Sequence, residues 1–259
     1  MSNSNLETRN SKLFTIFAAF TFALMSYGMY QALIAAPTER TMGAAQRIFY
    51  IHVPSAWVAF MCFGLNFLAS VVFLARRNQP LGRRADALAV AAAEVGIICC
   101  TVVLVTGPIW ARKAWGVWWA WDLRLTTTLV LWLIYLAYLM LRRFSSTGNA
   151  PLMAAVLAVF SFADVPFVWF AIRFRDYRGN HPKPVFGNGP NQGLHPAILK
   201  AFLINLAAFT AFGILLITVR YALERARQSA ADRRLAVELR DSSAPNSRFT
   251  RPELQEVSH

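Results

Sequence analysis

Six long apolar segments constrain the fold of this chain more than any other feature of its sequence. They cover residues 13–36, 49–75, 86–109, 124–142, 150–172 and 197–219. Each is close to the ~20 residues that an α-helix needs to cross the hydrocarbon core of a bilayer. Within hydrocarbon the backbone must satisfy its own hydrogen bonds, and a helix does so inside a single segment. The sequence therefore predicts an all-α, polytopic membrane protein with six transmembrane helices.

The sequence predicts two parts, a membrane domain and a C-terminal tail. The apolar run of the first segment is longer than the ~7–15 residues of a signal peptide, so we expect a retained helix. Residues 1–220 then form one six-helix domain. In the tail, 221–259, acidic and basic residues first alternate, as on a solvated helix that continues the last span. From about Asp241 the run of small polar residues predicts disorder.

Arginines predict the orientation of the spans. On one side of the predicted bilayer lie Arg76, Arg77, Arg83, Arg84, Arg142, Arg143, Arg225 and Arg227. The positive-inside rule makes this side cytoplasmic, so both termini are expected to be cytoplasmic and the connection between spans three and four periplasmic. These basic residues orient the spans and contact anionic lipid headgroups, which explains part of the net charge of +13. The charge therefore does not indicate nucleic-acid binding.

The sequence contains no motif of a common enzyme class. Cys62, Cys99 and Cys100 all lie inside predicted spans, where they behave as small apolar residues. No CxxC or CxxCH motif occurs, so the chain is not itself a c-type cytochrome. A phosphate-binding loop and a serine-nucleophile elbow are also missing from the sequence. We therefore expect a protein that is not an enzyme.

A tryptophan-rich segment, residues 110–122, connects spans three and four. It contains Trp110, Trp115, Trp118, Trp119 and Trp121. Such a cluster suits a flat apolar ligand with polar edges, although indoles also anchor helices at a membrane interface. A helical turn here would place Trp115, Trp118 and Trp119 on one side with Asp122. Because anchoring tryptophans usually come singly, we favour a binding platform over an anchor.

Three histidines are predicted to share the periplasmic side with this segment. His52 lies at the entrance to the second span, and His181 and His195 lie between the fifth and sixth spans. Two neutral imidazoles on opposite faces of a macrocycle would hold haem iron as axial ligands. The alternative for each histidine is an ordinary polar residue at the interface. Because the three histidines share this side with the tryptophans, a haem site is as good an interpretation as three ordinary polar residues.

Charged residues near the histidines and tryptophans offer partners for the haem propionates. Arg124 and Arg47 are the better candidates, because arginine binds a carboxylate through two parallel hydrogen bonds. Arg124 alternatively extends from its span to the membrane interface. Asp122 either fixes the shape of the tryptophan segment or caps the helix that begins at Leu123, and we favour the cap.

Several motifs resemble those of one family of haem-handling membrane proteins. Residues 115–126, WGVWWAWDLRLT, are similar to the tryptophan-rich WWD signature of cytochrome c maturation proteins. The six spans, the RIFYIHVP stretch at 47–54, Glu94-Val-Gly and Thr106-Gly-Pro resemble the CcmC family of haem exporter proteins most. The likeness covers about residues 15–220, nearly all of the membrane part.

The resemblance implies a scaffold for haem at the periplasmic face of the bacterial inner membrane. Such proteins hold haem b transiently, as cargo, and help to pass it to the haem chaperone CcmE. They work beside the ABC transporter subunits CcmA and CcmB and the small membrane protein CcmD. In the family two outward-facing histidines serve as axial ligands, and in this chain we expect the tryptophan segment to cover the porphyrin. His52 matches the first of these ligands by its surrounding motif.

The second ligand matches His181 best, with His195 as the alternative. The family usually has paired tryptophans shortly before this histidine, whereas this chain has the stretch RDYRGN at 175–180. Other functions also stay open at this point. They are a cytochrome c synthase subunit of the CcsA type, which has more spans, a transporter of haem itself, and a membrane oxidoreductase with haem b. The last class places its histidines within spans, which this chain does not.

Overall fold

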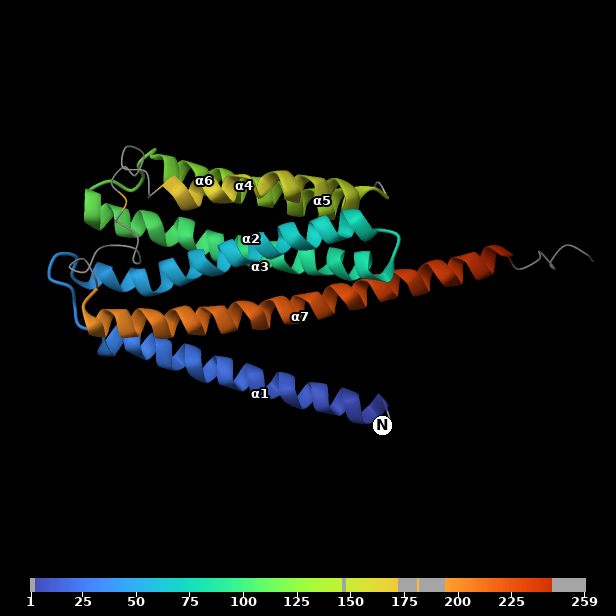
Figure 1. Ribbon diagram of the computed structural model, residues 1–259, viewed down its shortest axis with the longest axis horizontal. Helices are drawn as coiled ribbons and strands as arrows, with labels where there is room; N and C mark the ends of the chain where they lie inside the picture. Colours follow the sequence, from blue (N-terminus) through green and yellow to red (C-terminus); the bar gives the residue numbers. More distant parts are fainter. Residues whose placement is uncertain (1–2, 146–147, 172–180, 182–193, 244–259) are drawn as a thin grey trace, which may run out of the picture.

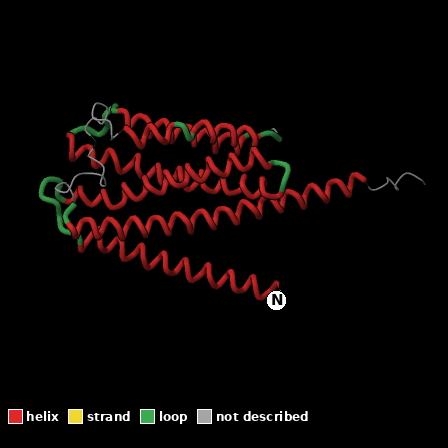
Figure 2. Tube along the Cα trace, viewed as in Figure 1, coloured by secondary structure: helices red, strands yellow, loops and turns green. Residues whose placement is uncertain are grey.

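The computed structural model describes residues 3–145, 148–171, 181 and 194–243. These residues form α1 (Asn3–Tyr30), α2 (Phe49–Arg76), α3 (Pro80–Trp115), α4 (Leu123–Phe144), α5 (Ala150–Ser161), α6 (Asp164–Ala171) and α7 (Pro196–Ser243). A π-helical turn, Gln31–Ala35, extends α1, and a 3-10 helix, Ala44–Ile48, leads into α2. The described residues contain no strand (Figure 2). Six helical segments are long and apolar enough to cross a membrane, which confirms the predicted all-α class and its six spans.

The helices lie nearly parallel in three groups (Figure 1). α2 and α3 form the centre, α4, α5 and α6 cover one side, and α7 with α1 covers the other. α1 packs mainly on α7. One end of the bundle, here called the tryptophan end, is where α3 finishes and α4 begins; the opposite end, where α2 finishes and α3 begins, is called the arginine end.

Small residues bring α2 and α3 together. Buried alanines line α3 between Ala85 and Ala93, and short side chains allow two helix backbones to approach closely in a membrane. A Cβ atom on Gly96 would lie 2.7 Å from Cε1 of Phe63, so this position has room for glycine alone. Asn66 adds a buried hydrogen bond, since its Nδ2 donates to the carbonyl of Ala89 at 2.8 Å. The pair therefore forms the packed centre on which the other helices lie.

The fifth span differs from the single helix expected over 150–172. It consists of α5 and α6, which are separated at Phe162 and Ala163. Pro166 has no N–H, so it cannot bond the carbonyl of Phe162, which accepts from Val165 three residues on at 3.1 Å. This local tightening ends one helix and starts the next. Asp164 begins α6 with a buried Oδ2 atom that has no hydrogen-bond partner among the described residues.

α7 continues well beyond the predicted sixth span. Its 48 residues correspond to about 72 Å, more than twice the ~30 Å of the hydrocarbon core. The helix projects past the other helices at the arginine end (Figure 1). The alternating charges after Tyr221 thus lie on a helix, as predicted. Disorder was expected from about Asp241, but residues 241–243 still belong to α7, and the rest of that stretch, from 244 onward, lies outside the described residues.

Ion pairs join the helices at the arginine end. Arg220 on α7 donates through Nε and Nη2 to the two carboxylate oxygens of Glu94 on α3, and also bonds Glu224 at 3.1 Å. Arg142 on α4 makes a second two-pronged pair with Asp86 on α3, at 2.5 and 3.0 Å. Within a span, an ionisable residue usually faces the protein interior and a partner. Glu94 is such a residue, and its ion pair with Arg220 joins α3 to α7.

Candidate functional site

His52 lies in the first turn of α2 at the tryptophan end. Just before it, Tyr50 is fully buried and Phe49 packs its ring against Phe202 of α7, with the ring centroids 4.9 Å apart. These contacts fix the rotation of the helix at its start. His52, two residues after Tyr50, is then turned toward α3 and is partly buried.

The imidazole of His52 contacts the TGP motif of α3. Its Nδ1 lies 2.9 Å from Oγ1 of Thr106. The ring also lies against the next residue, Gly107, where a Cβ atom would be in van der Waals contact with Cε1 of His52 at 3.4 Å. Thr106 was not among the predicted site residues, so its contact with His52 was not expected. The motif was visible in the sequence, but only the packing of α2 against α3 pairs its hydroxyl with the histidine.

The tryptophan segment does not form the predicted helical turn. α3 ends at Trp115, because Gly116 adopts a left-handed conformation with φ 77°, which is the usual way a glycine terminates a helix. Arg112 donates a hydrogen bond to the carbonyl of Gly116 and holds this turn. The chain then runs without helix to Asp122. The expectation that Trp115, Trp118 and Trp119 share one helical side with Asp122 is therefore wrong.

The indoles instead form two edge-to-face pairs around the end of α3. Trp110 contacts Trp115 with ring centroids 5.4 Å apart, and Trp119 contacts Trp121 at 5.7 Å. Trp118 and Trp121 are 60% and 77% exposed, so two large aromatic surfaces face outward. The Nε1 atom of Trp119 is buried and has no hydrogen-bond partner among the described residues. The segment thus presents two exposed aromatic faces, Trp118 and Trp121.

Asp122 caps α4, as predicted. Its Oδ1 accepts from the backbone N–H of Leu125 at 2.8 Å. Burial raises the pKa of its carboxyl above the usual value, although the hydrogen bond from Leu125 and the charge of Arg124 act in the opposite direction. Its second oxygen, Oδ2, is buried and has no partner among the described residues.

Replacing Asp122 with alanine is expected to lower the free energy of unfolding by about 1 kcal/mol, the usual effect of losing a helix cap. Asp122→Asn keeps an acceptor oxygen and should lose much less. The comparison is made by unfolding both variants with sodium dodecyl sulfate and following tryptophan fluorescence. Equal losses in the two variants would argue against the cap.

Arg124 and Arg47 both lie at the tryptophan end, and each holds a backbone carbonyl. Nη1 of Arg124 donates to Val168 of α6 at 3.1 Å, while Nη1 of Arg47 donates to Ala32 at the end of the first span at 3.0 Å. The guanidinium of Arg124 is within electrostatic range of both His52 and Asp122. Arg124 therefore joins the start of α4 to α6, and Arg47 joins the first span to the second.

The two other histidines differ in their surroundings. His195 is exposed and precedes α7; its Nδ1 accepts from the N–H of Ala197 at 3.3 Å and its carbonyl accepts from Leu199 at 2.9 Å. His195 thereby caps the last helix. His181 is partly buried. Most of the connection around it, 172–180 and 182–193, lies outside the described residues, including the RDYRGN stretch.

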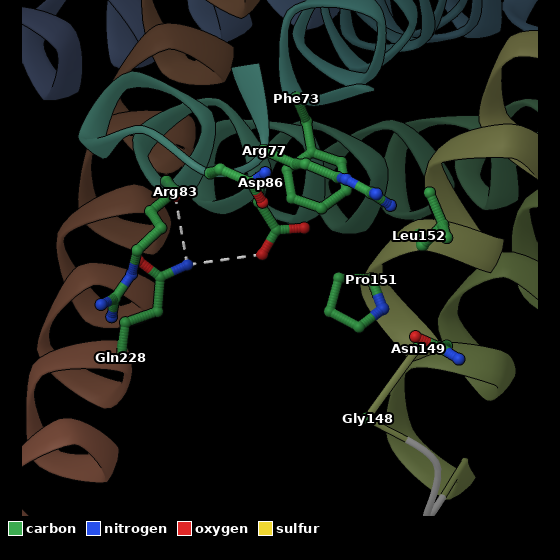
Figure 3. A pocket seen from close by; sticks show the side chains of 10 residues that line it. Phe73, Arg77, Arg83, Asp86, Gly148, Asn149, Pro151, Leu152 and Gln228 are labelled. Atoms are coloured by element: carbon green, nitrogen blue, oxygen red, sulfur yellow. Dashed lines mark hydrogen bonds between the residues drawn. The ribbon is translucent and has the colours of Figure 1, made fainter. Parts of the chain in front are cut away.

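A pocket at the arginine end lies away from all of these residues. It has a volume of about 360 Å³ and opens between the α2–α3 turn, the start of α5 and α7. Figure 3 shows Asp86 in this pocket with Gln228 of α7 beside it. Nε2 of Gln228 donates to the carbonyl of Arg83 at 3.2 Å and to Oδ2 of Asp86 at 3.4 Å. Because the carboxylate of Asp86 is already paired with Arg142, we interpret the pocket as a gap in the packing between helices and not as a ligand site.

Comparison with known proteins gives a consistent result. The family model described as CcmC, Heme exporter protein C, matches residues 2–237. The chain is 35% identical over 210 residues to Heme exporter protein C of Bradyrhizobium diazoefficiens, which is 80% of this chain and 76% of that protein. It is 29% identical to the protein of the same name in Haemophilus influenzae, over 85% of this chain and 87% of the relative. For the Paracoccus denitrificans protein of that name the identity is 29%, covering 75% and 79% of the two chains.

Proposed function

The chain belongs to the heme exporter protein C family, and we propose that it holds haem at the periplasmic face of the bacterial inner membrane for delivery to the chaperone CcmE. The family match supports a role in haem handling for cytochrome c maturation. The proposed partners are CcmE, the ABC transporter subunits CcmA and CcmB, and the small protein CcmD. The cargo is proposed to be haem b, held without covalent attachment to this chain.

One observation carries the proposal: an imidazole, a guanidinium and exposed indoles lie together at one end of the bundle. His52 contacts the end of α3, from which the tryptophan segment departs. Arg124 follows that segment and is in electrostatic range of His52. Haem needs this combination, since its iron takes imidazole, its propionates pair with arginine, and its ring lies against aromatic surfaces.

The proposed binding residues divide by the part of haem that they contact. His52 and His181 are the axial ligands of the iron. Trp115, Trp118, Trp119, Trp121 and Asp122 form the wall, and Arg124 and Arg47 bind the propionates. His195 is the less favoured ligand, because its imidazole already caps α7 through Nδ1. Arg47 uses one donor for Ala32, and a guanidinium has five N–H groups.

The proposed orientation follows from charge. Arg76, Arg77, Arg83 and Arg142 lie at the arginine end, where α2 and α4 finish and α3 begins. Basic residues next to a span remain on the cytoplasmic side, so this end is assigned to the cytoplasm and the tryptophan end to the periplasm. The projecting part of α7 then extends into the cytoplasm, where the nucleotide-hydrolysing part of an ABC transporter works.

Release of the cargo is part of the proposed mechanism. The haem is passed on, so its affinity must be moderate or must fall when the chaperone docks. Trp118 and Trp121 are exposed, which leaves one edge of a haem beside them accessible to a partner. No chemistry on the haem is assigned to this chain, because the covalent bond is expected to form on the chaperone.

The test is an optical spectrum of the detergent-purified protein after co-expression with its chaperone. Wild type is expected to contain low-spin haem, as two imidazole ligands produce. His52→Ala and His181→Ala should each lose the haem or convert it to the high-spin form, because one axial ligand is removed. His195→Ala is the matched control from the same connection and should retain the wild-type spectrum.

Other outcomes contradict particular parts of the proposal. A high-spin spectrum in His195→Ala but not in His181→Ala would move the second ligand to His195. No haem in any sample, together with a chaperone that is loaded normally when His52, His181 and His195 are all replaced by alanine, would make the tryptophan segment a membrane anchor and remove the proposed function.

A further inference from the structure

We infer that Thr106 is a positioning residue that fixes the tautomer of His52, so that Nε2 is the nitrogen offered to the haem iron. The haem part of this inference rests on the proposed function. The tautomer part rests only on the contact between α2 and α3. A neutral imidazole carries its proton on one nitrogen and a lone pair on the other, and only the nitrogen with the lone pair can bind a metal.

The contact between the two side chains does not by itself identify the donor. Nδ1 of His52 and Oγ1 of Thr106 are 2.9 Å apart, a normal hydrogen-bond length. A hydroxyl can donate one proton or accept, and an imidazole nitrogen can do either according to its tautomer. The direction of this bond therefore depends on where the single hydroxyl proton of Thr106 goes.

The backbone of α3 takes that proton. Oγ1 of Thr106 lies 2.6 Å from the carbonyl oxygen of Val102, one helical turn earlier, and 3.5 Å from that of Val103. A carbonyl oxygen can only accept, so the hydroxyl must donate to it. Such a bond to the preceding turn is a common arrangement for threonine in a helix. The hydroxyl oxygen is then left as an acceptor toward His52.

The tautomer follows directly. Nδ1 of His52 must carry the proton and donate it to Thr106, so Nε2 keeps its lone pair. Gly107 lies beside the ring, because a Cβ atom on that residue would be 3.4 Å from Cε1 of His52, an ordinary van der Waals contact. The ring is thus held against α3 at its Nδ1–Cε1 edge. Histidines that bind metals usually donate their other N–H to such a partner, which fixes the ring and makes it a better ligand.

The first test uses the protein without haem. The full chain labelled with ¹⁵N-histidine contains four histidines, and the signal of His52 is assigned by its loss in His52→Gln. At neutral pH we expect Nδ1 of His52 to show the shift of a protonated nitrogen and Nε2 that of an unprotonated one. Thr106→Ser keeps the hydroxyl and should give the same pattern. Thr106→Val removes the acceptor but keeps the shape, and should give a mixture of the two tautomers.

Thr210→Val is the matched control, because Thr210 makes the same bond to its own helix, with Leu206 at 2.7 Å, but lies on α7. It should leave the pattern of His52 unchanged. A wild-type protein in which His52 carries its proton on Nε2 would overturn the inference, and so would a Thr106→Val pattern equal to that of wild type. The wild-type measurement needs no substitution, so it decides the question even where a variant folds poorly.

The second test measures haem affinity. Thr106→Val should bind added haem about 10- to 100-fold more weakly than wild type, the usual effect of removing such a partner from a metal ligand. Thr106→Ser and Thr210→Val should remain close to wild type. Unchanged affinity in Thr106→Val would overturn the positioning role.

The two tests separate this inference from the proposed function. If the expected tautomer is found but His52→Ala binds haem normally, the ligand assignment is wrong and the haem part of the inference is lost with it. If binding requires His52 but the proton is found on Nε2, the proposed function stands and the role of Thr106 is wrong.

Discussion

Replacing Arg142 with methionine is expected to lower the free energy of unfolding by about 3–5 kcal/mol, because it leaves Asp86 buried without its cation. The side chains of Arg142 and Asp86 are only 14% and 11% exposed, and two hydrogen bonds at 2.5 and 3.0 Å join them. The measurement is unfolding in sodium dodecyl sulfate followed by tryptophan fluorescence.

Two further variants show whether the effect comes from the pair itself. Arg143→Met changes the adjacent, exposed arginine on the same helix and should change the stability by less than about 0.5 kcal/mol. Asp86→Leu combined with Arg142→Met removes both charges and should recover most of the loss, as apolar replacements of buried pairs usually do. A double variant as unstable as Arg142→Met would show that the helices depend on something other than the pairing of charge.

Substituting Gly82 with alanine is expected to disrupt the turn between α2 and α3. A Cβ atom on Gly82 would lie 2.2 Å from the carbonyl oxygen of Arg76 and 2.8 Å from Cα of Arg77. These are backbone atoms, which cannot move aside as a flexible side chain does. Overpacking typically lowers stability by about 1–3 kcal/mol, and a clash with backbone belongs at the upper end of that range. The same unfolding experiment measures the loss.

Gly148→Ala is the control for this prediction. It lies in the turn before α5, also at the arginine end, and a Cβ atom there would meet nothing within 4 Å. Its stability should be close to that of wild type. If Gly82→Ala is as stable as Gly148→Ala, the turn between α2 and α3 can adjust to a side chain, and close packing at position 82 is not required for stability.

The membrane part of the fold was predictable because one rule dominates it. Hydrocarbon requires a long apolar helix wherever the chain crosses, so the six spans were visible as six apolar segments. The ends of the helices were less predictable. α3 runs from Pro80 to Trp115, past both ends of its apolar segment, because Pro80 starts the helix and the left-handed Gly116 ends it.

The local structure around the candidate site was predictable only in part. The cap at Asp122 was predicted because it depends on a local hydrogen bond to Leu125. The arrangement of the indoles was predicted wrongly, because Gly116 ends α3 with a left-handed residue and replaces the helical spacing with a loop. A glycine permits this conformation without requiring it, so the pattern of tryptophans alone could not reveal it.

The sequence by itself determined that the chain spans a membrane six times, and it showed connections rich in arginine on one side and a tryptophan-rich connection on the other. These features depend on the composition of single segments and on their order. The tertiary structure decided which side chains meet: His52 with Thr106, Arg142 with Asp86 and Arg220 with Glu94. These residues are 54, 56 and 126 positions apart in the chain, and only the packing of one helix against another brings them within hydrogen-bond distance.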